Sequence, residues 1–189
     1  QSLEAYMNMP LGDSSAIRIS AYDLKDGGWI DNELTSKTFT NSGYTIDNSE
    51  VAEDDYNELN KSGYRVRFAT EIMNQNLDLS ILDQSSTFGG SWETDEAVGP
   101  RSNSRFNEEK FDDDFSQFSL SLSGDINDNL EYVFTTSSFD RDVNYTYDYS
   151  EYVEYYNYDG PTYTCDYYDY YYYYNISGCQ DPRMSYTQT

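Results

Sequence analysis

Six segments of the chain alternate between apolar and polar residues with a period of two, which constrains the fold more than any other feature. Between residues 64 and 72, Val66 and Phe68 fall on one face, and Arg65 and Arg67 fall on the other. A period of two is typical of β-strands that have one apolar face. The other segments are 2–9, 16–22, 77–81, 115–125 and 130–138. The sequence therefore predicts an all-β protein with six amphipathic strands.

The connections between these segments alternate in length. Short turns at 10–15, 74–76 and 125–129 contain Pro, Gly, Asn or Asp, which favour tight turns. The remaining segments, 25–60, 89–114 and 140–189, are long and hold 26 of the 35 acidic residues. A soluble sandwich does not usually sort its loops so strictly between its two ends, whereas an outer-membrane barrel does.

We therefore expect an antiparallel up-and-down meander that forms part of an outer-membrane β-barrel, with long extracellular loops. Residues 1–140 would hold the six barrel strands with their intervening loops, and residues 141–189 a Tyr-rich extracellular loop. Ile17, Ile19, Phe68, Leu79, Leu120 and Phe134 would share the outer face, because a one-residue slip in register would turn an apolar row inward.

The charge of the chain limits its partners. There are 35 acidic and 11 basic residues and no histidine, which gives a net charge of −24. Nucleic acids and anionic lipid headgroups would repel such a chain, so we expect no nucleic-acid partner. No apolar run approaches the roughly 18 residues that a transmembrane helix requires. Nothing near Gln1 resembles a signal peptide, so the chain is interpreted as an excerpt, or a mature segment, of a longer protein.

The stretch MPLGDSSAIRISAYDLKDGGWIDN, residues 9–32, combines a tight turn, a strand and a glycine-rich exit into a loop. Pro10 fixes its φ, and Asp13 can bond a backbone N–H within the turn. Gly27 and Gly28 permit the backbone reversals that a strand-to-loop exit needs. Trp29 follows where the strand would leave the bilayer, as in the aromatic girdle of a barrel.

These residues resemble the early barrel hairpin of TonB-dependent receptors, in which a Pro-Leu-x-Asp-Ser turn leads into Ala-x-Arg-x-Ser-Ala-Tyr and an aromatic-Ile-Asp-Asn. The stretch TTSSFDRDVNY, residues 135–145, is similar to the strand of that family that ends in aromatic-Asp-Arg before a long external loop. By the family's order the six strands would be about strands two to seven of a barrel of about 22. The plug domain, the energy-coupling box and the remaining barrel are not visible in this sequence.

The resemblance implies energy-coupled uptake of a scarce ligand, such as a ferric siderophore or another bulky nutrient, across the outer membrane of a Gram-negative bacterium. The implied partners are outer-membrane lipid, the ligand (a siderophore or glycan) and, through the absent plug region, the inner-membrane TonB energy-coupling complex. Two alternatives stay open at this point. One is a passive porin-like barrel, and the other is a secreted acidic, Tyr-rich adhesion protein.

No catalytic constellation is present in the sequence. Histidine, a nucleophile elbow, a phosphate-binding loop and metal-ligand spacing of cysteines are all missing, so we predict no enzyme, cofactor or metal site. The carboxylate runs at 53–55 and 112–114 could bind Ca²⁺, but they lack the spacing of a calcium loop. A solvated acidic surface is the more ordinary interpretation of such runs.

Aromatic residues in the loops are the candidate ligand-binding residues, because Tyr and Trp offer rigid amphipathic contact area. They are Trp29, Trp92, Tyr170, Tyr171 and Tyr172, and the alternative is packing of one loop on another. Cys165 and Cys179 are the only cysteines, and seven tyrosines lie between them. Both fall in the segment expected outside the cell, where a disulfide persists. A bridge would stabilise the loop by about 3 kcal/mol in the chain-entropy model. The alternative is two free thiols.

Overall fold

The computed structural model describes residues 1–38, 45–150 and 185–188, and every element that it names there is a strand. The long strands are β1 (Ser2–Pro10), β2 (Ser15–Asp26), β6 (Leu59–Ile72), β7 (Gln75–Phe88), β9 (Lys110–Asn127) and β10 (Leu130–Asp148). The short strands are β3 (Asp31–Asn32), β4 (Ser36–Thr38), β5 (Thr45–Asp47), β8 (Ser102–Asn103) and β11 (Ser185–Gln188). Within the described ranges, no helix has the length and apolarity needed to cross a membrane.

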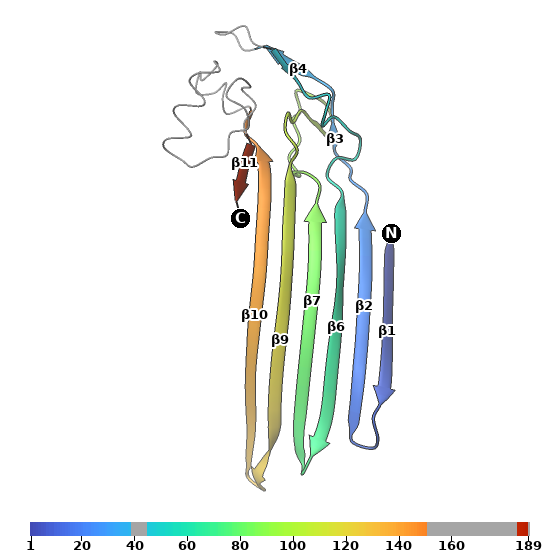
Figure 1. The fold of residues 1–189 in the computed structure, drawn as a ribbon, viewed down its shortest axis with the longest axis vertical. Coiled ribbons are helices and arrows are strands. Elements are labelled where there is room, and N and C mark those ends of the chain that lie inside the picture. Colours follow the sequence, from blue (N-terminus) through green and yellow to red (C-terminus); the bar gives the residue numbers. More distant parts are fainter. Residues whose placement is uncertain (39–44, 151–184, 189) are drawn as a thin grey trace, which may run out of the picture. The chain divides into compact units, whose positions relative to one another are not determined.

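The long strands form one sheet in the order β1-β2-β6-β7-β9-β10-β11, so that each long strand pairs with the next long strand along the chain (Figure 1). β1 and β2 are antiparallel, with Met7 opposite Ile19 and Asn8 opposite Arg18. This arrangement confirms the all-β, antiparallel up-and-down fold. Two small sheets, the parallel pair β3–β8 and the antiparallel pair β4–β5, were not expected from the sequence.

The chain divides into two compact units. The first consists of Gln1–Lys25, Asn60–Ser86 and Asp113–Asp142, and it holds most of the long strands. The second consists of Asp26–Leu59, Thr87–Asp112 and Val143–Thr189, and it is built mainly from the long connections. β10 continues to Asp148, beyond residue 140, and β9 begins at Lys110.

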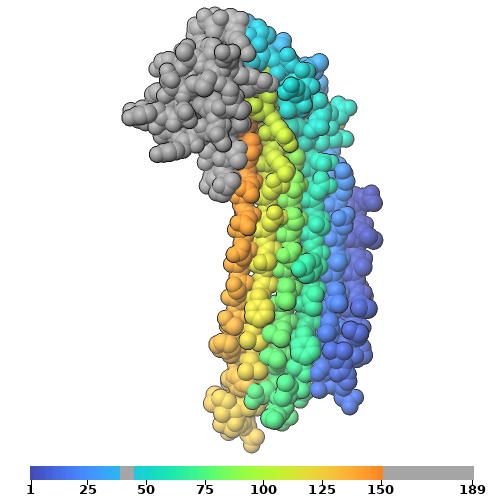
Figure 2. Space-filling model, viewed as in Figure 1, coloured from blue at the N-terminus to red at the C-terminus, as the bar shows by residue number. Residues whose placement is uncertain are grey.

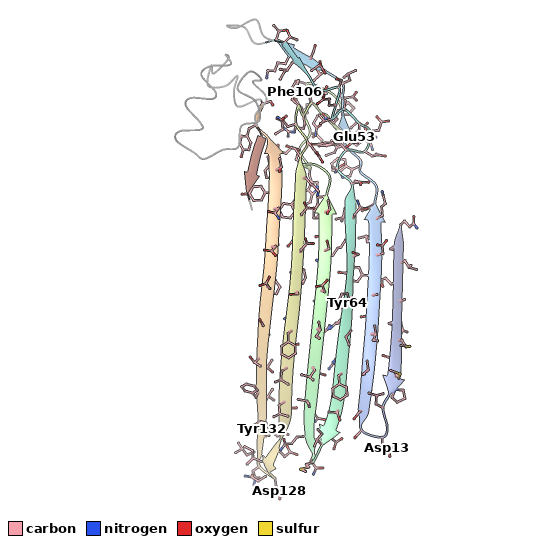
Figure 3. All side chains as sticks on the ribbon, viewed as in Figure 1. Asp13, Glu53, Tyr64, Phe106, Asp128 and Tyr132 are labelled. Atoms are coloured by element: carbon pink, nitrogen blue, oxygen red, sulfur yellow. The ribbon has the colours of Figure 1, made fainter. Side chains whose placement is uncertain are left out.

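Three tight turns lie at one end of the first unit, where Asp13 and Asp128 are labelled (Figure 3). In the β6–β7 hairpin, Met73 and Asn74 both have positive φ, at 52° and 62°. Positive φ at both central residues is the signature of a type I′ turn, whose twist matches that of the flanking strands. Gly12, with φ 96°, provides the corresponding freedom in the turn between β1 and β2.

One face of the first unit carries most of the apolar residues of its strands. On this face Ser15 of β2 bonds Thr70 of β6 through their hydroxyls, at 2.7 Å. A side chain at Gly124 of β9 would meet Gln75 of β7, which places these two positions on one face as well. On the other face, Arg67 of β6 bonds Asp78 of β7, and Ser121 of β9 bonds Thr135 of β10. These contacts and strand alternation bring the six predicted residues to one face: Ile17, Ile19, Phe68, Leu79, Leu120 and Phe134.

The opposite face of this unit is polar and carries its ion pairs. Arg67 of β6 pairs with Asp78 of β7, and Arg141 of β10 holds Asp113 of β9 with two hydrogen bonds of 2.6 and 2.8 Å. Tyr22 donates to Gln84 at 2.5 Å. The period of two therefore separates apolar and polar side chains as the sequence predicts. The apolar exceptions, whose positions fall on the polar face by alternation, are Leu24, Leu82, Phe115, Val133 and Phe139, and the rings of Phe115 and Phe139 contact each other at 5.5 Å.

The apolar face does not form a core among the described residues. Its side chains are widely exposed: Leu3 by 69%, Met7 by 54%, Phe118 by 44% and Phe134 by 55%. In the space-filling view the side chains of neighbouring strands themselves form the visible surface of this unit (Figure 2). The buried apolar side chains of the described chain all belong to the second unit; they are Ile30, Ile46, Tyr56 and Phe106.

Candidate functional site

The second unit is held together by buried asparagines that bond backbone groups distant in sequence. Asn32 donates its amide to the carbonyl oxygens of Val51, at 2.8 Å, and of Arg105, at 3.1 Å. Its own side-chain oxygen accepts the Arg105 N–H at 2.7 Å. Asn48 also donates to the Arg105 carbonyl, at 3.1 Å, and to the Glu33 carbonyl, at 2.8 Å. These asparagines pair backbone groups that no sheet satisfies.

The motif at 27–32 belongs to this unit, and the structure gives physical reasons for its residues. Ile30 is fully buried, and Asn32 is the hydrogen-bonding centre just described. Asp31 accepts the Asp55 N–H at 3.0 Å, and Asn57 accepts the N–H groups of both Trp29 and Ile30. The backbone of Asp55 passes so close to Gly28 that a Cβ there would overlap it.

Two carboxylates, Glu109 and Asp148, tie the ends of β9 and β10 to the loops. Glu109 is 3% exposed; it accepts the N–H of Ser91 at 3.0 Å and that of Asp148 at 3.1 Å. Asp148 accepts the Phe106 N–H at 2.6 Å and the Asn107 amide at 2.9 Å. These two carboxylates therefore accept hydrogen bonds from backbone N–H groups inside the unit.

Tyr56 lies at the centre of the same cluster, and its hydroxyl accepts the Glu109 N–H at 3.1 Å. Burial raises the pKa of the Tyr56 phenol far above its ordinary value, and the charge of Glu109 adds to the rise. The phenol therefore stays protonated. A side chain at Gly90 would overlap its ring, so this loop passes directly against the tyrosine.

A cleft of about 580 Å³ opens on this unit, in the region of the labelled Glu53 (Figure 3). Its lining is strongly acidic, with Lys110 as the single basic residue among the carboxylates of Glu50, Glu53, Asp54, Asp55, Glu58, Glu108 and Glu109. Among the described residues, no three or more acidic, cysteine or histidine side chains are grouped closely enough to hold a metal ion. Asp112 of the predicted run 112–114 is paired with Lys110.

The structure places the two predicted tryptophans apart from this cleft, since neither lines it. Trp29 is 49% exposed, and Trp92 is 67% exposed with its ring edge-on to Phe88 at a centroid distance of 5.7 Å. No contact joins the two indole rings in the described chain. Tyr170, Tyr171, Tyr172, Cys165 and Cys179 lie outside the described residues, so the tyrosine and disulfide predictions stay predictions.

Trp92 belongs to a row of aromatic side chains that sequence reasoning missed. Phe88 of β7 contacts Phe111 of β9 at 5.8 Å, and Phe111 stacks on Tyr145 of β10 at 6.3 Å with 15° between the ring planes. Tyr145 in turn contacts Tyr147 at 5.3 Å. We call Trp92, Phe88, Phe111, Tyr145 and Tyr147 the aromatic row. Aromatic residues near strand ends were the only available signal, and their order across three strands depends on the register.

Comparisons with known proteins add no relative: no protein-family model, curated protein or solved structure matches the chain.

Proposed function

We propose that the chain is the early-strand region of an outer-membrane β-barrel, and that the barrel is a TonB-dependent receptor for energy-coupled uptake of a scarce ligand. The observation that carries the proposal is the exposed apolar face of the first unit. It extends across all six long strands, and its members include Leu3, Met7, Ile19 and Phe134.

A face of this kind is costly in water. Removing apolar surface from water stabilises a protein by about 25 cal/mol per square ångström. A continuous apolar row over six strands therefore indicates a surface that contacts another apolar phase. Lipid is the phase that accepts apolar side chains along whole strands, because paired strands leave no backbone group unsatisfied in the bilayer. The strands also have the roughly 9–11 residues or more that a tilted crossing needs.

The polar face supports a lumen on the other side. The ion pairs Arg67–Asp78 and Arg141–Asp113 hold four charged groups on this face. Charged residues on a lipid-facing surface would destabilise a barrel, whereas a water-filled or plugged lumen accepts them. Short turns at one end and long, folded connections between the strands fit the periplasmic and extracellular sides of such a barrel.

The resemblance of residues 9–32 favours a receptor over a passive porin. Ile30 and Asn32 of this motif stabilise the second unit, which we also call the loop unit. A plain connection between two strands would not require such a compact unit. The secreted adhesion protein is disfavoured by the exposed apolar face, because a protein that works in water would bury it.

Fractionation and cross-linking test the proposal. The full-length protein, expressed in a Gram-negative host, should enter the outer-membrane fraction, require detergent for extraction and cross-link in cells to the energy-coupling protein. Deletion of that coupling protein should leave the location unchanged and remove the cross-link. Recovery in the medium without detergent would favour the adhesion protein, and an outer-membrane barrel with no cross-link would favour the porin.

A further inference from the structure

The aromatic row is a second exposed feature, and all five of its residues belong to the second unit. Thr87 and Asp112 are joined by a hydrogen bond of 2.7 Å, which places them on one face of β7 and β9. Their neighbours Phe88 and Phe111 therefore lie on the opposite face of these two strands by alternation.

The row is not part of the buried core. The buried apolar residues of the unit are Ile30, Ile46, Tyr56 and Phe106, and none of the five rings is among them. The two ends of the row are open, with Trp92 67% exposed and Tyr147 39% exposed, while the rings between them are half-buried. Rings that are fixed by their neighbours but accessible at their edges or faces form a preorganised contact surface.

The charges around the row limit what it can bind. Sixteen of the unit's described residues are acidic and four are basic (Lys37, Arg101, Arg105 and Lys110), so an anionic ligand would be repelled. The acidic neighbours of the rings already have partners. Glu93, next to Trp92, pairs with Arg105 at 2.8 Å, and Asp112, next to Phe111, pairs with Lys110 at 2.9 Å. Asp148, next to Tyr147, caps the Phe106 N–H. These three carboxylates therefore do not require a positively charged group on the ligand.

We propose that the aromatic row is a stacking track for a neutral oligosaccharide, a proposal that rests on the proposed function. Each sugar ring has an apolar C–H face that can lie on an aromatic ring and a rim of hydroxyls that stays hydrated. The phenolic hydroxyl of Tyr147 supplies a donor and an acceptor to that rim. Successive rings of the row, with centroids 5.3 to 6.3 Å apart, allow the sugar chain to advance one unit at a time.

Calorimetry of the purified protein in detergent micelles tests the track. Maltohexaose, cellohexaose and xylohexaose are the neutral probes, and hexagalacturonate is the anionic probe of equal length. At least one neutral hexasaccharide should bind, and the anionic one should bind at least about tenfold more weakly. Phe111→Leu, which keeps an apolar side chain but removes the central ring, should raise the Kd of the neutral sugar by about tenfold.

Phe118→Leu is the matched control, because it removes a ring from the apolar face of the same strand. It should leave the Kd unchanged, and circular dichroism should show that both variants retain the sheet. The proposal is overturned if no neutral hexasaccharide binds, if the anionic sugar binds as tightly, or if Phe111→Leu binds like the wild type. These outcomes are distinct from failure of the proposed function, which would appear as loss of the outer-membrane location or of the cross-link.

Discussion

Asn32→Asp should unfold the loop unit while leaving the long strands paired. The substitution keeps the size and shape of the side chain but replaces the amide donor with an oxygen. That donor serves the carbonyl oxygens of Val51 and Arg105, at 2.8 and 3.1 Å. The new oxygen would face both acceptors within a site that is 2% exposed.

The magnitude follows from these contacts. Two buried carbonyl groups lose a donor, each at about 1–3 kcal/mol, although Asn48 still serves the Arg105 carbonyl. A buried carboxyl must in addition stay protonated or be ionised without a cation, which adds further destabilisation. We expect a loss of about 3–5 kcal/mol in the free energy of unfolding of the loop unit, enough to populate its open state.

Hydrogen–deuterium exchange read by mass spectrometry measures this loss. Peptides that cover 26–38, 45–58 and 89–109 should lose protection in Asn32→Asp, whereas peptides from β1, β2 and β6 should keep theirs. Asn144→Asp, an exposed site in the same unit, makes the same chemical change and should have little effect. Unchanged protection in Asn32→Asp would refute the view that this amide organises the loops.

Three further perturbations follow from the same contacts. Gly28→Ala should destabilise the loop unit by about 1–3 kcal/mol because its Cβ overlaps the Asp55 backbone, while Gly27→Ala has open space and should be nearly neutral in a urea titration. Tyr56→Phe should cost about 1–3 kcal/mol at pH 8, because it leaves a buried backbone N–H unpaired. Folding raises the pKa of the Tyr56 phenol, so above a pH of about 10 the wild type should lose up to about 1.4 kcal/mol of stability per pH unit through this group, and Tyr56→Phe should not. A difference in stability between the two proteins that stays constant above a pH of about 10 would contradict this assignment. Leu120→Arg should impair folding into lipid vesicles by about 2–4 kcal/mol, and Ser119→Arg on the polar face should not; equal effects of the two would count against a lipid-facing row.

Local alternation was enough to predict the strands of the first unit. Because successive strand side chains point to opposite faces, Phe68 and Leu120 could be assigned to one face without knowledge of the register. The turn between β6 and β7 was also found from its Asn residue, although the structure places its centre at Met73 and Asn74. Sequence and structure agree here because the determining interactions are local.

The loop unit could not be predicted in this way. Asn32 and Arg105 are 73 residues apart, and the parallel pair of β3 and β8 joins equally distant segments. Nothing in the local sequence of Asn32 or Asn48 distinguishes a buried hydrogen-bonding centre from an ordinary turn residue. The aromatic row was missed for the same reason, since Phe88, Phe111 and Tyr145 become neighbours only when three strands align.

Depth-dependent quenching by brominated lipids tests the central claim most directly. In a chain whose native Trp29 and Trp92 are replaced by Phe, a single tryptophan is introduced at position 120 or at position 119, and each variant is folded into vesicles. Leu120→Trp should be quenched strongly by bromine near the acyl-chain ends, because its side chain faces lipid, and Ser119→Trp should be quenched little. Equal quenching at the two positions, or quenching at neither, would contradict a membrane-spanning sheet with one face toward lipid.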